Sequence, residues 1–164
     1  CVAGGVWQCD WRINKNAAVH DVRTLDLKRI RLMQLHEIEE WDIEAVKQAI
    51  AAGSDVNAKC WETGRSPLTL AVADGGHKEI AELLITEGAN VNGKDDSYRE
   101  GTPLHMATIQ DRKEVAELLI AKGSDVNAMD NDGQTPLDYA GDETADLLRK
   151  HGGKTGEELK AEGK

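Results

Sequence analysis

The chain has 164 residues, 40% of them hydrophobic and 30% charged, a composition that fits one globular domain and argues against a disordered segment. Phenylalanine is absent and aromatic residues make up 4%, so leucine, isoleucine, valine and alanine must build most of the core. The net charge of −10 is uneven, because residues 1–34 hold six basic and three acidic side chains while the rest holds 14 basic and 27 acidic ones. Contacts with phosphates need clustered lysine and arginine, so an acidic body argues against nucleic acid as a partner.

Residues 1–34 form a basic N-terminal arm that shares no motif with the rest of the chain. Between residues 17 and 33 the apolar positions fit partly a helix, at Ala18, Val22 and Leu25, and partly the alternation of a strand. We favour a helix that covers the open end of the domain that follows.

The cysteines are irregularly spaced, at Cys1, Cys9 and Cys60, with no CxxC pair and no adjacent histidine pair, so we predict no metal site. A Cys9–Cys60 disulfide requires the arm to fold back onto residue 60, and the sequence leaves this open. No apolar run approaches the roughly 18 to 20 residues of a bilayer-spanning helix, so we predict no transmembrane segment.

Cys1 is followed by a stretch of small residues, and this resembles the mature N-terminus of a bacterial lipoprotein, where the first cysteine carries the lipid. On that interpretation Cys1 is a lipidation site and the protein belongs to the bacterial cell envelope. On the alternative interpretation the chain is a fragment that begins at an arbitrary residue, and the protein is cytoplasmic.

Three segments of the body fall into register when the chain is compared with itself, namely AVKQAIAAGSDVNAK at 45–59, IAELLITEGANVNGK at 80–94 and VAELLIAKGSDVNAM at 115–129. Their glycines, Gly53, Gly88 and Gly123, are 35 residues apart, and such a period predicts a repeat architecture. Apolar residues in each copy recur at intervals of three and four, which places them on one face of a helix. Each glycine is expected to end its helix in the left-handed conformation.

A second motif precedes the later copies, as GRSPLTLAV at 64–72, GTPLHMAT at 101–108 and GQTPLDYA at 133–140. Pro67, Pro103 and Pro136 each mark an expected helix start, because proline is pre-set for the first turn and has no amide hydrogen to leave unpaired there. The serine or threonine before each proline is the expected N-cap. Each unit is therefore predicted to be a turn, a short helix, a second helix and a glycine stop.

These motifs resemble the ankyrin repeat in its G-x-TPLH-x-A opening, its ELLI helix and its G-[AS]-[DN]-V-N-A close. The resemblance covers residues 35–153, with a degenerate first repeat at 35–50 and a truncated last repeat at 135–153. It implies an all-α solenoid of about four stacked helix-turn-helix repeats with projecting hairpin tips. The remaining residues, 154–164, are predicted to be a polar C-terminal tail, similar to the tails of bacterial ankyrin-repeat proteins.

In the ankyrin family the hairpin tips and the inner face of the first helices contact partner proteins, and we transfer this role by position. The tips are predicted at Lys59–Glu62, Asp95–Arg99 and Asp130–Asp132, and the exposed inner positions at Thr69, Ala73, Met106, Gln110 and Tyr139. The candidate partner-binding residues are therefore Trp61, Glu62, Thr69, Asp95, Asp96, Tyr98, Arg99, Met106, Gln110, Asp130 and Asp132.

Two features of the predicted tips have alternative interpretations. Trp61 and Tyr98 lie in inserted loop stretches, where a large aromatic side chain either anchors an interface or folds onto its own loop. The tip aspartates either form an acidic stripe that attracts a partner protein with a basic surface, or are the solvated charges usual in turns.

His36 and His105 occupy the histidine position of the motif, for which the resemblance implies a structural hydrogen bond between loops. The sequence contains no GxSxG, HExxH or GxxxxGK[ST] motif, so we predict neither an enzyme nor a bound cofactor. It predicts a monomeric protein-protein interaction module. The alternatives are an envelope-anchored structural spacer held through Cys1 and the regulatory subunit of an enzyme.

Overall fold

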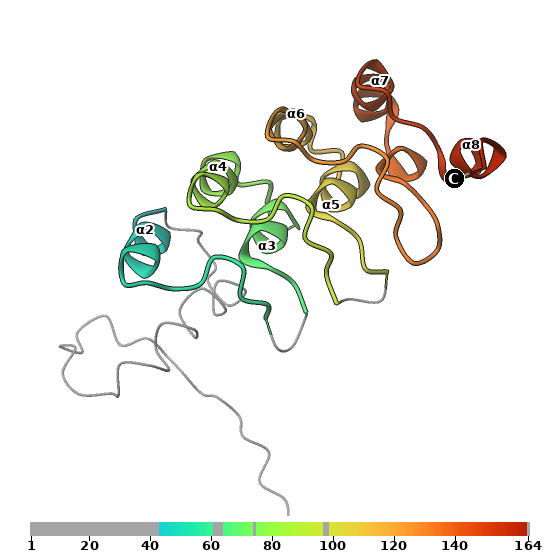
Figure 1. Ribbon diagram of the computed structural model, residues 1–164. Helices are drawn as coiled ribbons and strands as arrows, with labels where there is room; N and C mark the ends of the chain where they lie inside the picture. Colours follow the sequence, from blue (N-terminus) through green and yellow to red (C-terminus); the bar gives the residue numbers. More distant parts are fainter. Residues whose placement is uncertain (1–42, 61–63, 74, 97–98, 164) are drawn as a thin grey trace, which may run out of the picture.

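The computed structural model describes residues 43–60, 64–73, 75–96 and 99–163, and within them the regular structure is helical, with no strand. In chain order the helices are α2 (Ile43–Ala51), α3 (Pro67–Ala73), α4 (Lys78–Thr86), α5 (Pro103–Ile109), α6 (Lys113–Ala121), the 3-10 helix η2 (Pro136–Tyr139), α7 (Asp142–Lys150) and α8 (Gly156–Ala161). Figure 1 shows two rows, with α2, α4, α6 and α7 in the outer row and the other helices in the inner row, beside the hairpin tips. The predicted all-α solenoid is confirmed.

The helix starts and stops follow the local signals in the sequence. The three motif prolines are the first residues of α3, α5 and η2. The glycines that follow α2, α4 and α6 have φ values of 84° at Gly53, 94° at Gly88 and 91° at Gly123, a conformation that a side chain disfavours. The last repeat is shortened as predicted, because η2 has four residues where α5 has seven.

One continuous hydrophobic core runs from α2 to α7 through the middle of the stack. It contains a fully buried leucine from almost every helix, namely Leu68, Leu84, Leu104, Leu119 and Leu148. Fully buried alanines, among them Ala81 and Ala116 on the outer helices, separate these leucines. Their short side chains let helices of successive repeats approach closely, and each repeat then buries its apolar face against its neighbours only.

An asparagine at the end of each V-N close joins one repeat to the next. The Asn92 side chain donates from Nδ2 to the Gly123 carbonyl at 3.2 Å and accepts at Oδ1 from the Asp125 amide at 2.8 Å. Asn57 and Asn127 make the same two bonds to the backbone of the repeat that follows each of them. The amide group is suited to this position because it offers a donor and an acceptor side by side.

We expect an Asn92→Asp variant to lose about 1 to 3 kcal/mol of unfolding free energy, because the carboxylate keeps the acceptor but faces the Gly123 carbonyl with an oxygen instead of an N–H. Urea denaturation monitored by circular dichroism measures this. The same change at Asn131, which is exposed at the third tip, is the control and should alter stability by less than about 0.5 kcal/mol. Equal losses in the two variants would contradict the linking role of Asn92.

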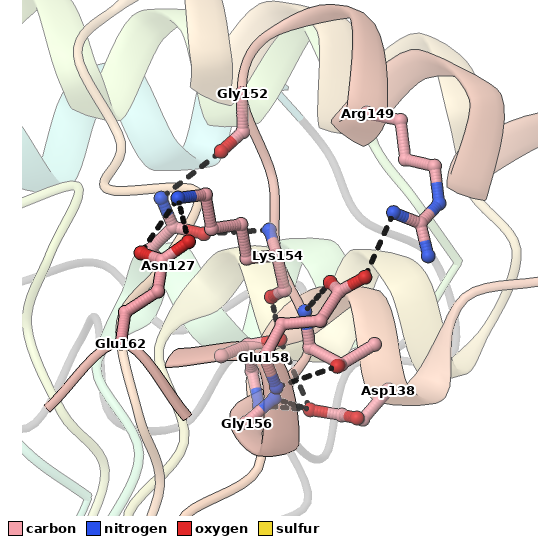
Figure 2. A network of polar contacts seen from close by, with 10 residues as sticks. Asn127, Asp138, Arg149, Gly152, Lys154, Gly156, Glu158 and Glu162 are labelled. Atoms are coloured by element: carbon pink, nitrogen blue, oxygen red, sulfur yellow. Dashed lines mark hydrogen bonds and ion pairs between the residues drawn. The ribbon is translucent and has the colours of Figure 1, made fainter. Parts of the chain in front are cut away.

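Residues 154–164, predicted to be a polar tail, instead contain helix α8, which packs on the end of the stack beside η2. Figure 2 shows the polar contacts that hold it, in which Asn127 accepts from the Lys154 amide at 2.8 Å and Asp138 accepts from the Gly156 amide at 2.8 Å. Leu159 inserts as a buried apolar contact and is 5% exposed. Helix α8 therefore occupies the inner-row position of a further repeat and closes this end of the core.

Helix α8 begins with a reciprocal capping arrangement. The Thr155 hydroxyl accepts from the Glu158 amide at 3.2 Å, and the Glu158 carboxylate accepts from the Thr155 amide at 2.8 Å. These hydrogen bonds to the charged form, led by the one from the Thr155 backbone, lower the pKa of Glu158. The T-x-x-E sequence at 155–158 is the signature of such a box, so this helix start was detectable in the sequence.

Candidate functional site

The hairpin tips between the helix pairs form a row along one edge of the solenoid (Figure 1). Backbone hydrogen bonds join successive tips, from the Asp96 amide to the Gly64 carbonyl at 3.0 Å and from the Asn131 amide to the Arg99 carbonyl at 2.9 Å. The position of each tip is therefore fixed by the tip before it. The predicted order of three tips along one surface agrees with this arrangement.

Charged side chains pair between neighbouring tips, always with the cation on the earlier tip and the carboxylate on the later one. Lys59 pairs with Asp96, Arg65 Nε lies 3.9 Å from Asp95 Oδ2, and Arg99 Nε lies 3.8 Å from Asp132 Oδ2. Asp96, Arg99 and Asp132 are exposed, so their pairs are weak individually. The tips therefore present alternating charges to solvent.

The predicted acidic stripe of four exposed aspartates is wrong for two of its members. The side chain of Asp95 is 1% exposed and that of Asp130 is 6% exposed, so neither carboxylate faces solvent. Both residues follow the V-N close by three positions. Asp130 lies against Tyr139 of the following helix η2, whereas Asp95 faces Thr69 and Arg65 of the preceding repeat. Only Asp96 and Asp132 remain as exposed tip aspartates.

Asp130 is buried within a complete set of hydrogen-bond donors. Its carboxylate accepts from the amides of Asp132 and Gln134, both at 2.9 Å, and from the Tyr139 hydroxyl at 2.7 Å. Burial alone would raise the pKa of Asp130, but these hydrogen bonds outweigh it and the pKa is lowered. A charged carboxylate is thus the stable form at this position.

Tyr139 connects this buried carboxylate to the surface. Its hydroxyl donates to Asp130 and accepts from Arg99 Nη1 at 2.7 Å. Burial, followed by the bond to Asp130, raises the pKa of Tyr139, and the bond to Tyr139 is the main cause that raises the pKa of Arg99. The predicted binding residue Arg99 is therefore held in one orientation by the repeat that follows it.

His105 has the structural role that the motif implies. Its Nδ1 accepts from the Thr102 amide at 3.1 Å, which leaves the Nε2 hydrogen to donate to the Gln134 carbonyl of the next repeat at 3.2 Å. Burial lowers the pKa of His105, so the neutral ring that this bonding pattern requires is favoured. This hydrogen bond between loops confirms the prediction for His105, while His36 lies outside the described residues.

The inner face of the first helices differs in part from the prediction. Thr69 was expected to be exposed but is fully buried, because it occupies the motif's histidine position and its hydroxyl lies 3.1 Å from that of Ser66. Ala73 is also buried, at 8% exposure, whereas Gln110 is exposed and Met106 and Tyr139 are half-buried.

Ile109 is a surface residue that was not among the predicted contact residues. It is 47% exposed and is the large apolar side chain that faces solvent among the residues that the structure describes. It lies three positions after Met106 on α5, which is the spacing of one helix face. The spacing from Met106 was therefore a sign in the sequence that Ile109 shares its face of α5. The equivalent residue of α3, Ala73, is small and gave no indication of an apolar contact.

Three predicted contact residues, Trp61, Glu62 and Tyr98, lie outside the described residues, as do Cys1 and Cys9. Cys60, the cysteine within the described residues, is a free, buried thiol. In the described ranges no group of three or more histidine, cysteine and carboxylate side chains is placed to hold a metal ion. No helix in this part of the chain has the length and apolar character needed to cross a membrane.

Comparison with curated proteins finds several relatives that share this region. The transient receptor potential cation channel subfamily A member 1 of Homo sapiens is 32% identical over 119 residues, which are 70% of this chain and 10% of that protein. The Arf-GAP with coiled-coil, ANK repeat and PH domain-containing protein 2 of Homo sapiens is 41% identical over 71 residues, 43% of this chain and 9% of that protein. Myotrophin of Xenopus tropicalis is 42% identical over 53 residues, 32% of this chain and 43% of that protein.

The chain thus spans less than half of the length of each of these relatives. A family model described as ankyrin repeats (3 copies) matches residues 32–130 and 95–157, which together are most of the sequence. The helix pairs, the left-handed glycine stops and the bond from His105 to the next loop agree with that match. The chain belongs to the ankyrin-repeat family.

Proposed function

We propose that this chain is a protein-binding module that holds its partner against the inner face of α5 and the neighbouring hairpin tips. Ankyrin repeats generally mediate protein-protein interaction, and the family is typically non-enzymatic. The observation that carries the proposal is the exposure of Ile109. Covering a large apolar side chain with a partner removes it from water, and this lowers the free energy of the complex.

The inner patch consists of Met106, Ile109 and Gln110, at the C-terminal end of α5. Apolar and polar side chains lie next to each other there, as in the cores of protein interfaces, where a few well-packed residues supply most of the binding free energy. The corresponding position of α3 carries the small residue Ala73. An exposed Ile109 fits a partner that offers an apolar recess.

The tips supply charges of both signs beside this patch. Asp96, Arg99 and Asp132 are exposed, and the ion pairs in which the two aspartates take part cost little to break when a partner offers new ones, while Tyr139 keeps Arg99 in place. We propose that the partner carries basic groups opposite Asp96 and Asp132 and an acceptor opposite Arg99. Such complementarity sets orientation and specificity more than affinity. Trp61, Glu62 and Tyr98 are proposed as further contacts on the basis of the sequence.

The relatives do not identify the partner. They carry the names of a cation channel, an Arf-GAP and myotrophin, so the repeats that they share occur in proteins of unrelated description. A shared framework with different surface residues accounts for this, because function depends on the site and not on the fold.

Affinity capture from an extract of the source cells tests the proposal. The full chain should retain a specific partner, and a Met106→Ala, Ile109→Ala double variant should retain at least tenfold less of it, because it truncates the apolar centre of the surface. The partner recovered by the unmodified chain is then titrated against both proteins.

The matched control is a Glu117→Ala, Lys122→Ala double variant, which removes exposed side chains from α6 and the turn after it, in the outer row of helices. It should bind as the unmodified chain does. Full retention of the partner by the Met106, Ile109 variant, with its circular dichroism unchanged, would place the binding surface elsewhere.

A further inference from the structure

Asp95 is a buried carboxylate at the junction of the first two described tips. It is 1% exposed, and no hydrogen bond of normal geometry reaches either of its oxygens among the described residues. The nearest cation is Arg65, whose Nε lies 3.9 Å from Oδ2 and which belongs to the preceding tip. A buried carboxylate whose nearby donors do not reach normal hydrogen-bond geometry is destabilised as an anion.

Comparison with Asp130, which stands at the same position one repeat later, explains this situation. The Asp130 amide bonds to the Gln134 carbonyl, whereas the Asp95 amide bonds to the Gly101 carbonyl, so the loop closed by Asp95 is two residues longer. In the shorter loop the amides of Asp132 and Gln134 donate to the carboxylate of Asp130. Asp95 has no counterpart of the Tyr139 hydroxyl, because Met106 occupies the corresponding position on α5.

We propose that Asp95 is a pH-responsive latch, whose protonation in mildly acidic solution tightens the packing of its hairpin tip against the preceding one. The neutral acid removes the cost of a buried anion, and its O–H can donate to a neighbouring acceptor. The backbone bond from Asp96 to Gly64 belongs to the same junction and would open less often. This response of the fold is independent of any partner, and only its effect on binding rests on the proposed function.

The charged groups facing Asp95 from the described residues come from the preceding tip. They are Arg65 and, further away, Lys59, which pairs with Asp96 on Asp95's own tip. Thr69 on α3 and Ser66 in the turn before it carry no charge, and weak hydrogen bonds from the Thr69 side chain and the Ser66 backbone act to lower the pKa of Asp95. Burial raises the pKa of Asp95 from 3.8 to about 6, and these polar and charged neighbours oppose the shift without cancelling it.

The sign of the pH effect follows from this direction. In the closed form of the junction Asp95 is buried, and in the open form it is in water. Because the pKa of Asp95 is higher in the closed form, that form binds more protons between pH 3.8 and about 6. The junction therefore loses stability as the pH rises through this window and keeps the lower stability above it. With these two pKa values, closing is favoured about tenfold more at pH 5.0 than at pH 7.5.

Amide hydrogen exchange of the full chain, measured by NMR at pH 5.0 and 7.5 and corrected for intrinsic rates, tests the latch. The Asp96 amide should be about tenfold more protected at pH 5.0. An Asp95→Asn variant should show equal protection at both pH values, at the level of the unmodified chain at pH 5.0. The matched control, Asp130→Asn, should keep the tenfold dependence, since Asp95 is intact.

Equal protection at both pH values in the unmodified chain, or an unchanged dependence in Asp95→Asn, would overturn the latch. If Asp95→Asn does not fold, the carboxyl carbon of Asp95 is titrated by NMR in the unmodified chain. A midpoint near pH 6 supports the proposal, and a midpoint near 4 overturns it. Partner capture is not needed for either measurement, so a failure of the proposed binding function leaves this test intact.

Discussion

A Leu119→Ala variant is expected to lose about 3 to 4 kcal/mol of unfolding free energy, a large part of the total stability of a domain of this size. Leu119 is fully buried on α6, and α6 packs against the preceding outer helix, the following outer helix and its own partner α5. Truncation leaves a cavity. The three helices cannot move in to fill it without losing contacts with their other neighbours. Since each repeat of a solenoid is stabilised only by its neighbours, a cavity in the central repeat weakens both sides of the stack.

Urea denaturation at 25 °C measures this loss, with circular dichroism and hydrogen exchange as separate probes. The control is Ile109→Ala, which removes a similar aliphatic side chain that is 47% exposed and should cost less than about 1 kcal/mol. A loss at Ile109 as large as that at Leu119 would mean that Ile109 is part of the core, and would remove the basis for the proposed binding patch.

The helices could be predicted from the sequence because their boundaries depend on residues with strong local preferences. Proline begins α3, α5 and η2, and Gly53, Gly88 and Gly123 end the outer helices, wherever the neighbouring repeats lie. The three copies in phase then make the stacking predictable, since an isolated repeat cannot bury its apolar face.

The burial of individual polar residues could not be predicted in the same way. Thr69 and Met106 are one position apart in the motif, and a step of one residue on a helix changes the direction of the side chain by about 100°. The angle at which the repeats stack decides which of these side chains faces the next repeat. This angle cannot be derived from the sequence. The two extra residues after Asp95 were visible in the sequence, but the different bonding of the two aspartates was not: amides donate to Asp130, and no hydrogen bond of normal geometry from the described residues reaches the carboxylate of Asp95.

Helix α8 was missed because half of its residues are charged and Leu159 is its one large apolar residue. Its stability comes from one apolar contact, at Leu159, and from hydrogen bonds to side chains that are distant in sequence, such as Asn127 and Asp138. A segment of this kind has little hydrophobic periodicity, so composition assigns it to a tail. Only the capping pair of Thr155 and Glu158 distinguishes it in the sequence from a solvated end.

A Gly156→Ala variant is expected to detach α8 and to lower the unfolding free energy by about 3 kcal/mol. The backbone of Gly156 adopts an ordinary conformation, so an added methyl group causes no strain of its own. A Cβ there would instead collide with the carbonyl oxygen of Gly133 in the third tip, and this backbone atom cannot move aside as a side chain could. The bond from the Gly156 amide to Asp138 and the burial of Leu159 would be lost with the helix.

The control for this prediction lies four residues earlier in the chain. Gly152 has φ of +83°, and a Cβ there would meet nothing within 4 Å, so Gly152→Ala introduces backbone strain alone and should cost about 1 kcal/mol. Thermal unfolding should therefore show a melting temperature several degrees lower for Gly156→Ala than for Gly152→Ala. Exchange of the Lys154 and Gly156 amides should rise in the first variant. The reverse order of melting temperatures would mean that α8 does not close the core at this end, and that the last repeat is stable through η2 and α7 alone.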